Sequence, residues 1–149
     1  MQADSSSPQE AQILAAIIDV LHALKARTGE RENPATVFLL RHLRGTTPMR
    51  ISDLAEASRL DISTVSRHVK ALTEAGHVAR VEDPVDRRAC LVGITDAGVD
   101  LYDRAMSVRA EALSAAVADW PGADRTHLLD LVRRLATSLT HPAETRSTA

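Results

Sequence analysis

Apolar residues recur at every third or fourth position in several separate stretches of the chain, which is typical of helices with one buried face. Residues 8–28 and 34–44 show this period, and each stretch has a proline where a first helical turn would lie. The period returns for more than twenty residues after Thr95, a suitable N-cap, and again from Asp124 until His141. The pattern predicts a mainly helical chain.

The middle of the chain predicts two short helices in succession. Ser52 suits the N-cap of the first, over about residues 53–59, and Asp61 suits the N-cap of the second, over residues 61–76. The inner face of the second helix is Val65, Val69 and Leu72. Its outer face is Ser63, Thr64, Ser66, Arg67, His68 and Lys70. These polar groups suit phosphates and base edges, and the order of elements is that of a helix-turn-helix.

A β-hairpin is predicted directly after the second helix. Residues 77–81 alternate apolar and polar side chains, residues 89–94 read as the returning strand, and the charged residues 82–88 form the turn between them. Residues 49–51 are too few for an independent strand but could add an edge strand. A hairpin in this place is the wing of a winged helix-turn-helix. The predicted fold class is therefore mainly α with a small β-hairpin wing (α+β).

Composition narrows the picture in two respects. Aromatic residues make up 2% of the chain, so its core must consist of Leu, Val, Ile and Ala, which favours helices. The net charge is −2, yet residues 41–90 hold nine Lys and Arg against seven Asp and Glu. This basic excess is local and small, so DNA binding would depend on where the cations stand and on the pairing of two copies.

The sequence also bears on where the protein works. Its single cysteine, Cys90, excludes an intramolecular disulfide. The first ten residues are polar and lack the apolar core of a signal peptide. No apolar run approaches the ~18 residues of a membrane span. We therefore expect a cytoplasmic protein without membrane contact.

The helices predicted at the two ends of the chain carry apolar stripes for which the central unit offers no partner. The simplest solution is that they pack together and onto a second copy, so we expect an obligate homodimer. The predicted organisation is dimerisation helices at residues 1–30 and 120–149, a winged helix-turn-helix DNA-binding domain at 33–98 and a long connecting helix at 95–119.

Four segments stand in a distinctive order between residues 48 and 98: ISDLAEAS, LDISTVSRHVKALTEAGHVAR, EDPVDRRACLVGIT and TDAG. The most specific part is Asp86 and Arg88, followed by Thr95 and Gly98. In this ordered set the chain resembles the MarR family (multiple antibiotic resistance regulators). The resemblance implies a six-helix dimeric plan and a wing that reaches the minor groove. It also implies a small, often aromatic and anionic effector bound between the dimer helices and the winged domain.

The chain departs from the family pattern just before the second helix of the motif. The family usually has an apolar residue and then glycine there, whereas this chain has Ser58 and Arg59. Arg59 must therefore adopt a turn conformation without glycine's freedom, and it is a candidate for a phosphate contact. The N-terminal region also lacks the reactive cysteine of the family's peroxide-sensing branch, which argues against thiol sensing of that kind.

The second helix could present only a solvated face, but inside this motif a role in reading DNA is favoured. A helix of ~13 residues is about 20 Å long and fits the major groove. We predict that Arg67 contacts guanine O6 and N7 and that Lys70 contacts phosphate. Ser63 and Thr64 could bond either phosphate or base edges. Ser66 and His68 complete the predicted face.

The predicted wing turn carries Asp86, Arg87 and Arg88, which could be no more than a solvated turn. Adjacent arginines beside an aspartate favour another interpretation, in which Asp86 orients one guanidinium while the other is free. By the resemblance, Arg88 is the residue that enters the minor groove, with Asp86 as its support. An arginine in the minor groove responds to groove width and hence to A·T content.

Other chemistry-bearing residues give weaker signals. His22 and His42, on the first two helices, could line an effector cavity, although a packing role is the simpler interpretation. Cys90 is more typical of a small core or surface residue than of a sensor. No two histidines form a close metal-ligand pair, and no phosphate-binding glycine loop, nucleophile elbow or carboxylate pair stands out. We therefore expect no metal, no cofactor and no enzymatic activity.

Together these observations predict a homodimeric, sequence-specific DNA-binding transcription regulator, most simply a ligand-responsive repressor with an imperfectly palindromic operator. Its partners would be double-stranded DNA, a second copy of the chain and a small aromatic or anionic effector. The alternative is a winged helix that docks other proteins and does not bind DNA.

Overall fold

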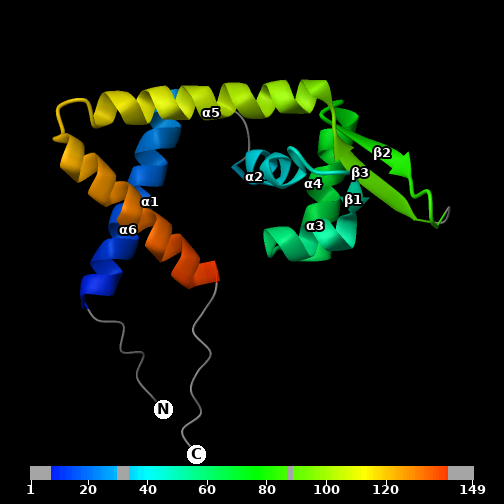
Figure 1. Cartoon of the computed structure of the whole chain (residues 1–149), viewed down its shortest axis with the longest axis horizontal. Helices are drawn as coiled ribbons and strands as arrows, with labels where there is room; N and C mark the ends of the chain where they lie inside the picture. The colour runs from blue at the N-terminus through cyan, green and yellow to red at the C-terminus, as the bar shows by residue number, and fades with distance from the viewer. Residues whose placement is uncertain (1–7, 30–33, 87–88, 141–149) are drawn as a thin grey trace, which may run out of the picture. The chain divides into compact units, whose positions relative to one another are not determined.

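The computed structural model describes residues 8–29, 34–86 and 89–140, and within them the chain forms six helices and three short strands (Figure 1). In chain order these are α1 (Pro8–Thr28), α2 (Pro34–Leu43), β1 (Met49–Arg50), α3 (Ile51–Ser58), α4 (Ile62–Glu74), β2 (Val78–Glu82), β3 (Cys90–Ile94), α5 (Asp96–Ala116) and α6 (Gly122–Thr140). The fold is mainly helical with one small sheet, which confirms the predicted fold class. The chain divides into two compact units between Ala112 and Leu113, inside α5.

Among the described residues, no helix combines the length and the apolar character that a membrane crossing requires.

The sheet consists of the predicted hairpin and the predicted edge strand. The strand order is β1-β3-β2, and both pairs are antiparallel. Val78 pairs with Ile94 at one end of the hairpin, and Glu82 pairs with Cys90 at the other. β1 leads straight into α3 and pairs with β3 of the hairpin, so it connects the wing to the first helix of the helix-turn-helix (Figure 1).

An aliphatic core holds α2, α3, α4 and the sheet together. Its almost completely buried side chains are Leu39, Leu40, Leu43, Leu54, Val65, Val69, Leu72, Val78 and Val92. The list includes all three residues predicted for the inner face of the second helix. Full burial of one such side chain stabilises the folded state by roughly 1.5–3 kcal/mol, so this cluster is the main reason that the winged unit folds.

The predicted start of α3 is wrong. The helix begins at Ile51, its N-cap is Arg50, and Ser52 lies inside the first turn. Arg50 makes no side-chain cap hydrogen bond. The physical reason is that β1 runs directly into α3, so no residue is left over between strand and helix to act as a capping serine.

The last helix also begins earlier than expected. α6 starts at Gly122 rather than at Asp124, because the N–H groups of Asp124 and Arg125 both donate to the Pro121 carbonyl. Its predicted end at His141 lies outside the described residues.

The first turn of α5 is locked onto the turn that follows α4. Thr95 Oγ1 donates to the Gly76 carbonyl at 2.7 Å and accepts the Gly98 N–H at 3.1 Å. The Thr95 N–H donates to the His77 carbonyl at 3.1 Å. Gly98 is buried against that carbonyl so closely that a Cβ would stand 2.1 Å from the oxygen. The motif of Thr95 and Gly98 therefore joins α4, β2, β3 and α5 at one point.

The terminal helices bury no residue in the single chain. The exposed large apolar side chains of α1 are between 37% and 60% exposed, and those of α6 are between 38% and 71% exposed. They include every residue of the predicted stripes except Leu24, which is half-buried, together with Val20 and Leu129: Ile13, Leu14, Ile17, Ile18, Val20 and Leu21 in α1, and Leu128, Leu129, Leu131, Val132, Leu135 and Leu139 in α6. These are the faces that the sequence assigns to a second copy.

Gly98→Ala should destabilise the protein, because the added Cβ must push either α5 or the His77 carbonyl away. Overpacking of this kind typically costs about 1–3 kcal/mol. Gly122→Ala is the matched control, since nothing lies within 4 Å of a Cβ at that position. The control should change the free energy of unfolding by less than about 0.5 kcal/mol. Urea unfolding measures both variants, and equal effects would contradict the close approach at Gly98.

Candidate nucleic-acid interface

The turn between α3 and α4 is built around a left-handed residue. Arg59 has φ 54° and ψ 32°, and it is the one non-glycine residue with positive φ in the part of the chain that the structure describes. Its N–H donates to the Glu56 carbonyl at 3.2 Å, and the Leu60 N–H donates to the Ala55 carbonyl at 3.1 Å. The predicted turn conformation is thus confirmed, with the side chain exposed. Left-handed conformation costs a non-glycine residue roughly 1–2 kcal/mol.

Asp61 caps α4 and gathers the first turn of the helix around its carboxylate. Oδ1 accepts the Thr64 N–H at 2.8 Å and the Ser63 hydroxyl, and Oδ2 accepts the Thr64 hydroxyl at 2.7 Å. Hydrogen bonds from Ser63 and then Thr64 lower the pKa of Asp61 far below its usual value, so the carboxylate is ionised at neutral pH. The predicted N-cap is confirmed. The same carboxylate also orients two hydroxyls that were predicted to meet DNA.

The outer face of α4 is narrower than the sequence suggested. Ser63, Arg67 and Lys70 are exposed and form one row along the helix, as predicted. Thr64, Ser66 and His68 are half-buried on its flanks, so their predicted outward position is confirmed only in part. The residues most open to a DNA groove are therefore the three in the row.

The two cations of the row differ in how they are held. Arg67 Nη2 donates to Thr64 Oγ1 at 3.3 Å, which turns the guanidinium toward the N-terminal end of α4. Because a guanidinium has five N–H donors, this bond leaves enough of them for a guanine edge. Lys70 Nζ lies 3.9 Å from Glu74 Oε1, and both side chains are largely exposed. Such a surface ion pair contributes little to stability, so Lys70 could readily exchange Glu74 for a phosphate.

The loop between β2 and β3 is organised by Asp83, which sequence reasoning missed. The residue is buried, and its Oδ1 accepts the N–H groups of Val85 at 2.9 Å and Asp86 at 3.3 Å. Its Oδ2 lies 2.8 Å from Arg50 Nη2 and also accepts from Arg50 Nε. The hydrogen bonds from Arg50, followed by the one from Val85, lower the pKa of the Asp83 carboxyl. The ion pair therefore ties β1 to the base of the wing.

The sequence contains a local signal for the bonds between Asp83 and the backbone of the turn, but none for its ion pair with Arg50. An aspartate followed by proline at 83–84 is typical of a turn in which the carboxylate bonds the backbone two residues on. The partner Arg50 lies 33 residues away along the chain, and nothing in the local pattern indicates it.

Asp86 also helps to build the wing loop. Its carbonyl accepts the Ala89 N–H at 2.9 Å, and the Asp83 N–H donates to the Ala89 carbonyl at 3.3 Å. Arg87 and Arg88 lie outside the described residues. The predicted support of an arginine by Asp86, and the predicted entry of Arg88 into a minor groove, therefore stay predictions. The described part of the loop is anchored by the Asp83 carboxylate and by these backbone hydrogen bonds.

The two histidines predicted as effector ligands have different surroundings. His22 is exposed on α1. It lines an open hollow of about 620 Å³ with Lys25, Ala26 and Gly29. His42 is half-buried on α2, where its ring meets Phe38 edge-on at a centroid distance of 4.8 Å. Burial, with a smaller effect of Arg41, lowers the pKa of His42 and favours the neutral ring. The ring contact and the burial suit a packing role for His42, whereas its Nε2, which is buried without a hydrogen-bond partner among the described residues, could still serve a ligand.

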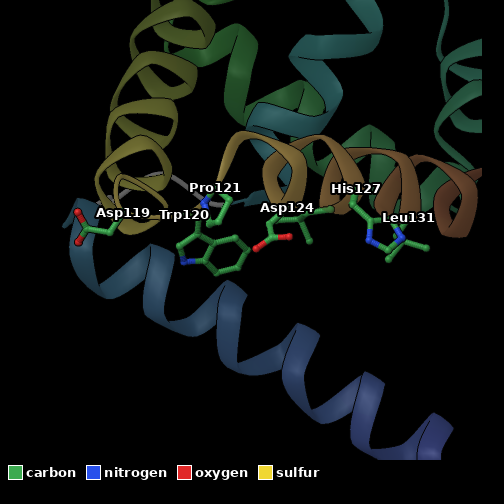
Figure 2. A pocket seen from close by; sticks show the side chains of 7 residues that line it. Asp119, Trp120, Pro121, Asp124, His127 and Leu131 are labelled. Atoms are coloured by element: carbon green, nitrogen blue, oxygen red, sulfur yellow. The ribbon is translucent and has the colours of Figure 1, made fainter.

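A second hollow, of about 410 Å³, lies at the corner where α5 gives way to α6 (Figure 2). Its lining residues are Asp119, Trp120, Pro121, Asp124, His127, Leu128 and Leu131. The corner is held by Arg125 Nε, which donates to the Trp120 carbonyl at 3.1 Å. The sequence indicated only a break between two helices at this point. The hollow could not be foreseen, because it depends on how the first turns of α6 fold back past Trp120.

A helix-turn-helix followed by a hairpin that is anchored in a three-stranded sheet defines a winged helix-turn-helix protein. Residues 33–90 match the sequence model of the MarR family. The chain is 34% identical over 109 residues to the uncharacterized HTH-type transcriptional regulator YxaD of Bacillus subtilis, a match that covers 73% of this chain and 76% of YxaD. The chain therefore belongs to the MarR family, and it is a DNA-binding transcription regulator.

Two solved structures illustrate the shared fold. One is the PcaV transcriptional regulator from Streptomyces coelicolor with its natural ligand, at a TM-score of 0.70 and 22% identity, covering 93% of this chain and 99% of PcaV. The other is BpsR of Bordetella bronchiseptica, whose DNA binding is regulated by 6-hydroxynicotinic acid, at a TM-score of 0.68 and 22% identity, covering 86% of this chain and 98% of BpsR. Family membership favours the regulator over the protein-docking module that the sequence left as an alternative.

Arg59→Gly should stabilise the protein by about 0.5–1 kcal/mol, because glycine adopts the left-handed conformation without steric cost. Arg59→Ala is the matched variant, since it removes the same guanidinium and keeps the strained backbone. If the Arg59 side chain contacts DNA, both variants should lose affinity equally while only the glycine variant gains stability. Urea unfolding and a DNA titration measure the two effects, and a destabilised Arg59→Gly would contradict the turn geometry.

Proposed function

We propose that this protein is a ligand-responsive repressor that binds a palindromic operator as a homodimer. The observation that carries the proposal is the exposed row of Ser63, Arg67 and Lys70 on a capped helix of a MarR-family winged unit. α4 has 13 residues, and a helix of that length is about 20 Å long and fits the major groove. Two copies related by symmetry would enter successive major grooves, which requires half-site centres about one turn of DNA apart.

The contacts of each half-site are assigned by side-chain chemistry. Arg67 pairs with guanine O6 and N7, and the exposed cations Lys70 and Arg59 bond phosphates. Ser63 and Thr64 stand at the end of α4 that enters the groove. Ser66 and His68 flank the row, and the wing residues Asp86, Arg87 and Arg88 serve the adjacent minor groove.

The second copy of the chain is proposed to cover the terminal helices. Exposed apolar residues follow one face of α1 and recur along α6. Soluble monomers rarely leave contiguous apolar patches of more than a few hundred Å² open to water. Burial of these faces in a homodimer would stabilise the pair and would place two copies of α4 on one operator.

The proposed effector is a small aromatic or anionic compound. Support comes from PcaV, which was solved with its natural ligand, and from BpsR, which responds to an aromatic acid. His22 and His42 remain the proposed contacts in this chain, and Lys25 would add a cation beside His22. The effector would act by favouring one of two dimer states that differ in the spacing of their α4 helices. The proposed place of action is the cytoplasm.

Arg67→Ala should weaken operator binding by about 1–3 kcal/mol per half-site with little change in salt dependence, because it removes a base contact. Lys70→Ala is the comparison on the same face of the same helix. It should weaken binding to all duplexes alike and reduce the slope of log K against log salt by about 0.9 for each lost phosphate contact. Fluorescence anisotropy with an operator selected from random duplexes measures both. Unchanged affinity in Arg67→Ala would refute its assignment.

The homodimer should appear in light scattering at micromolar concentration as twice the 16.1 kDa mass of one chain. Ile17→Glu places a charge in the apolar stripe of α1 and should shift the mass toward a single chain, because an unpaired charge is costly to bury. Gln12→Glu adds the same charge to the opposite face of α1 and should leave the dimer intact. A wild-type protein at the mass of one chain would rule out the dimer.

A further inference from the structure

In the first turn of α4, the hydroxyl protons of Ser63 and Thr64 are already used in hydrogen bonds to Asp61 in the absence of DNA. A serine or threonine hydroxyl has one proton to donate, and both Ser63 and Thr64 donate theirs to Asp61. The direction of these bonds is fixed, because an ionised carboxylate can only accept. Thr64 Oγ1 also accepts from Arg67 Nη2 at 3.3 Å. What the two hydroxyls can still offer to a ligand is therefore lone pairs.

Lone pairs discriminate sharply among the groups on DNA. Phosphate oxygens carry no hydrogen, so they cannot bond to a hydroxyl whose proton is already committed. In the major groove each base pair shows one amino group, on adenine N6 or cytosine N4, and one keto oxygen, on thymine O4 or guanine O6. A hydroxyl lone pair bonds the amino group and repels the keto oxygen. The negative charge of Asp61 strengthens both effects.

We propose that Asp61 is a positioning residue for base recognition, which makes Ser63 and Thr64 select an amino base, adenine or cytosine, at one position of each half-site. The inference rests on the proposed function, because it requires α4 to enter the major groove. It resolves the choice between phosphate and base edges for these two hydroxyls in favour of base edges. Arg67 supplies the complementary donors, so one end of α4 presents donors and acceptors side by side.

Asp61→Asn separates this role from folding. Asparagine is as good an N-cap as aspartate, and its Oδ1 can still accept the Thr64 N–H. The second oxygen becomes an NH₂ group, which cannot accept, so the Thr64 hydroxyl regains a proton that it can donate to a keto oxygen or to a phosphate. The variant should therefore keep its thermal stability and lose the base preference that the Thr64 hydroxyl supplies.

The test begins with wild-type protein and a pool of random duplexes, from which the bound operator is selected. Duplexes carrying each of the four base pairs at every half-site position are then titrated by anisotropy. Ser63→Ala and Thr64→Val locate the position that their hydroxyls read. There, wild type should bind adenine and cytosine on one strand within about threefold of each other and guanine and thymine at least about tenfold more weakly.

In Asp61→Asn the discrimination that Thr64→Val assigns to the Thr64 hydroxyl should fall below about threefold, with tighter binding to unrelated DNA, whereas Ser63 can still donate to Oδ1. Asp53→Asn is the control, because it removes the same charge from an exposed position in the first turn of α3. This control should keep the wild-type preference. A Thr64-dependent base preference that survives in Asp61→Asn overturns the inference, as does a wild-type pattern that groups the bases in another way. If wild type selects no sequence at all, the proposed function fails and the inference fails with it.

Discussion

The contact between the first turn of α5 and the turn after α4 is the constraint on which the rest of the structure depends. Gly98 approaches the His77 carbonyl too closely for any side chain, and the Thr95 hydroxyl bonds the Gly76 carbonyl. The end of α4, the start of β2 and the end of β3 all meet at this point. A displacement of the first turn of α5 is therefore passed to α4 and to the wing together, because Thr95 and Gly98 contact the turn that links α4 to β2.

Local signals account for what the sequence predicted well. Asp61 caps α4 because the chain places a carboxylate where the first N–H groups of a helix lack partners, and Gly76 follows α4 with φ +78°. Arg59 could be identified as a strained turn residue because the family pattern has glycine there. In each case the cause and its effect lie within a few residues of each other, so the pattern contains the answer.

Tertiary contacts account for what was missed. The ion pair joins Arg50 of β1 to Asp83 in the loop after β2, and α3 begins early because β1 runs directly into it. The same holds for the candidate site. The sequence identified Ser63 and Thr64 as hydroxyls at the right end of α4, but the direction of their hydrogen bonds follows from rotamers that only the folded helix defines. Residue types were predictable there, and their donor or acceptor character was not.

The charge of the winged unit bears on how the protein would gain affinity for DNA. The chain carries a net charge of −2, and its cations are concentrated only slightly in the winged unit. Asp61 even places an anion beside the row that is proposed to face DNA, which opposes general attraction to phosphate. Such a surface gains little from nonspecific attraction, so the proposed operator affinity depends on correct hydrogen bonding at a few positions and on the proposed pairing of two copies.

The corner between α5 and α6 has a consequence for spectroscopy. The chain contains a single tryptophan, Trp120, which lines that corner and is 44% exposed. All tryptophan emission therefore originates in the C-terminal unit, and the unit that carries α4 and the wing is silent at those wavelengths. A molecule or a second chain that covers the corner would shift the wavelength of the tryptophan emission, so no added label is needed to detect it. DNA would shift the Trp120 emission only if binding at α4 changes the structure along the whole length of α5.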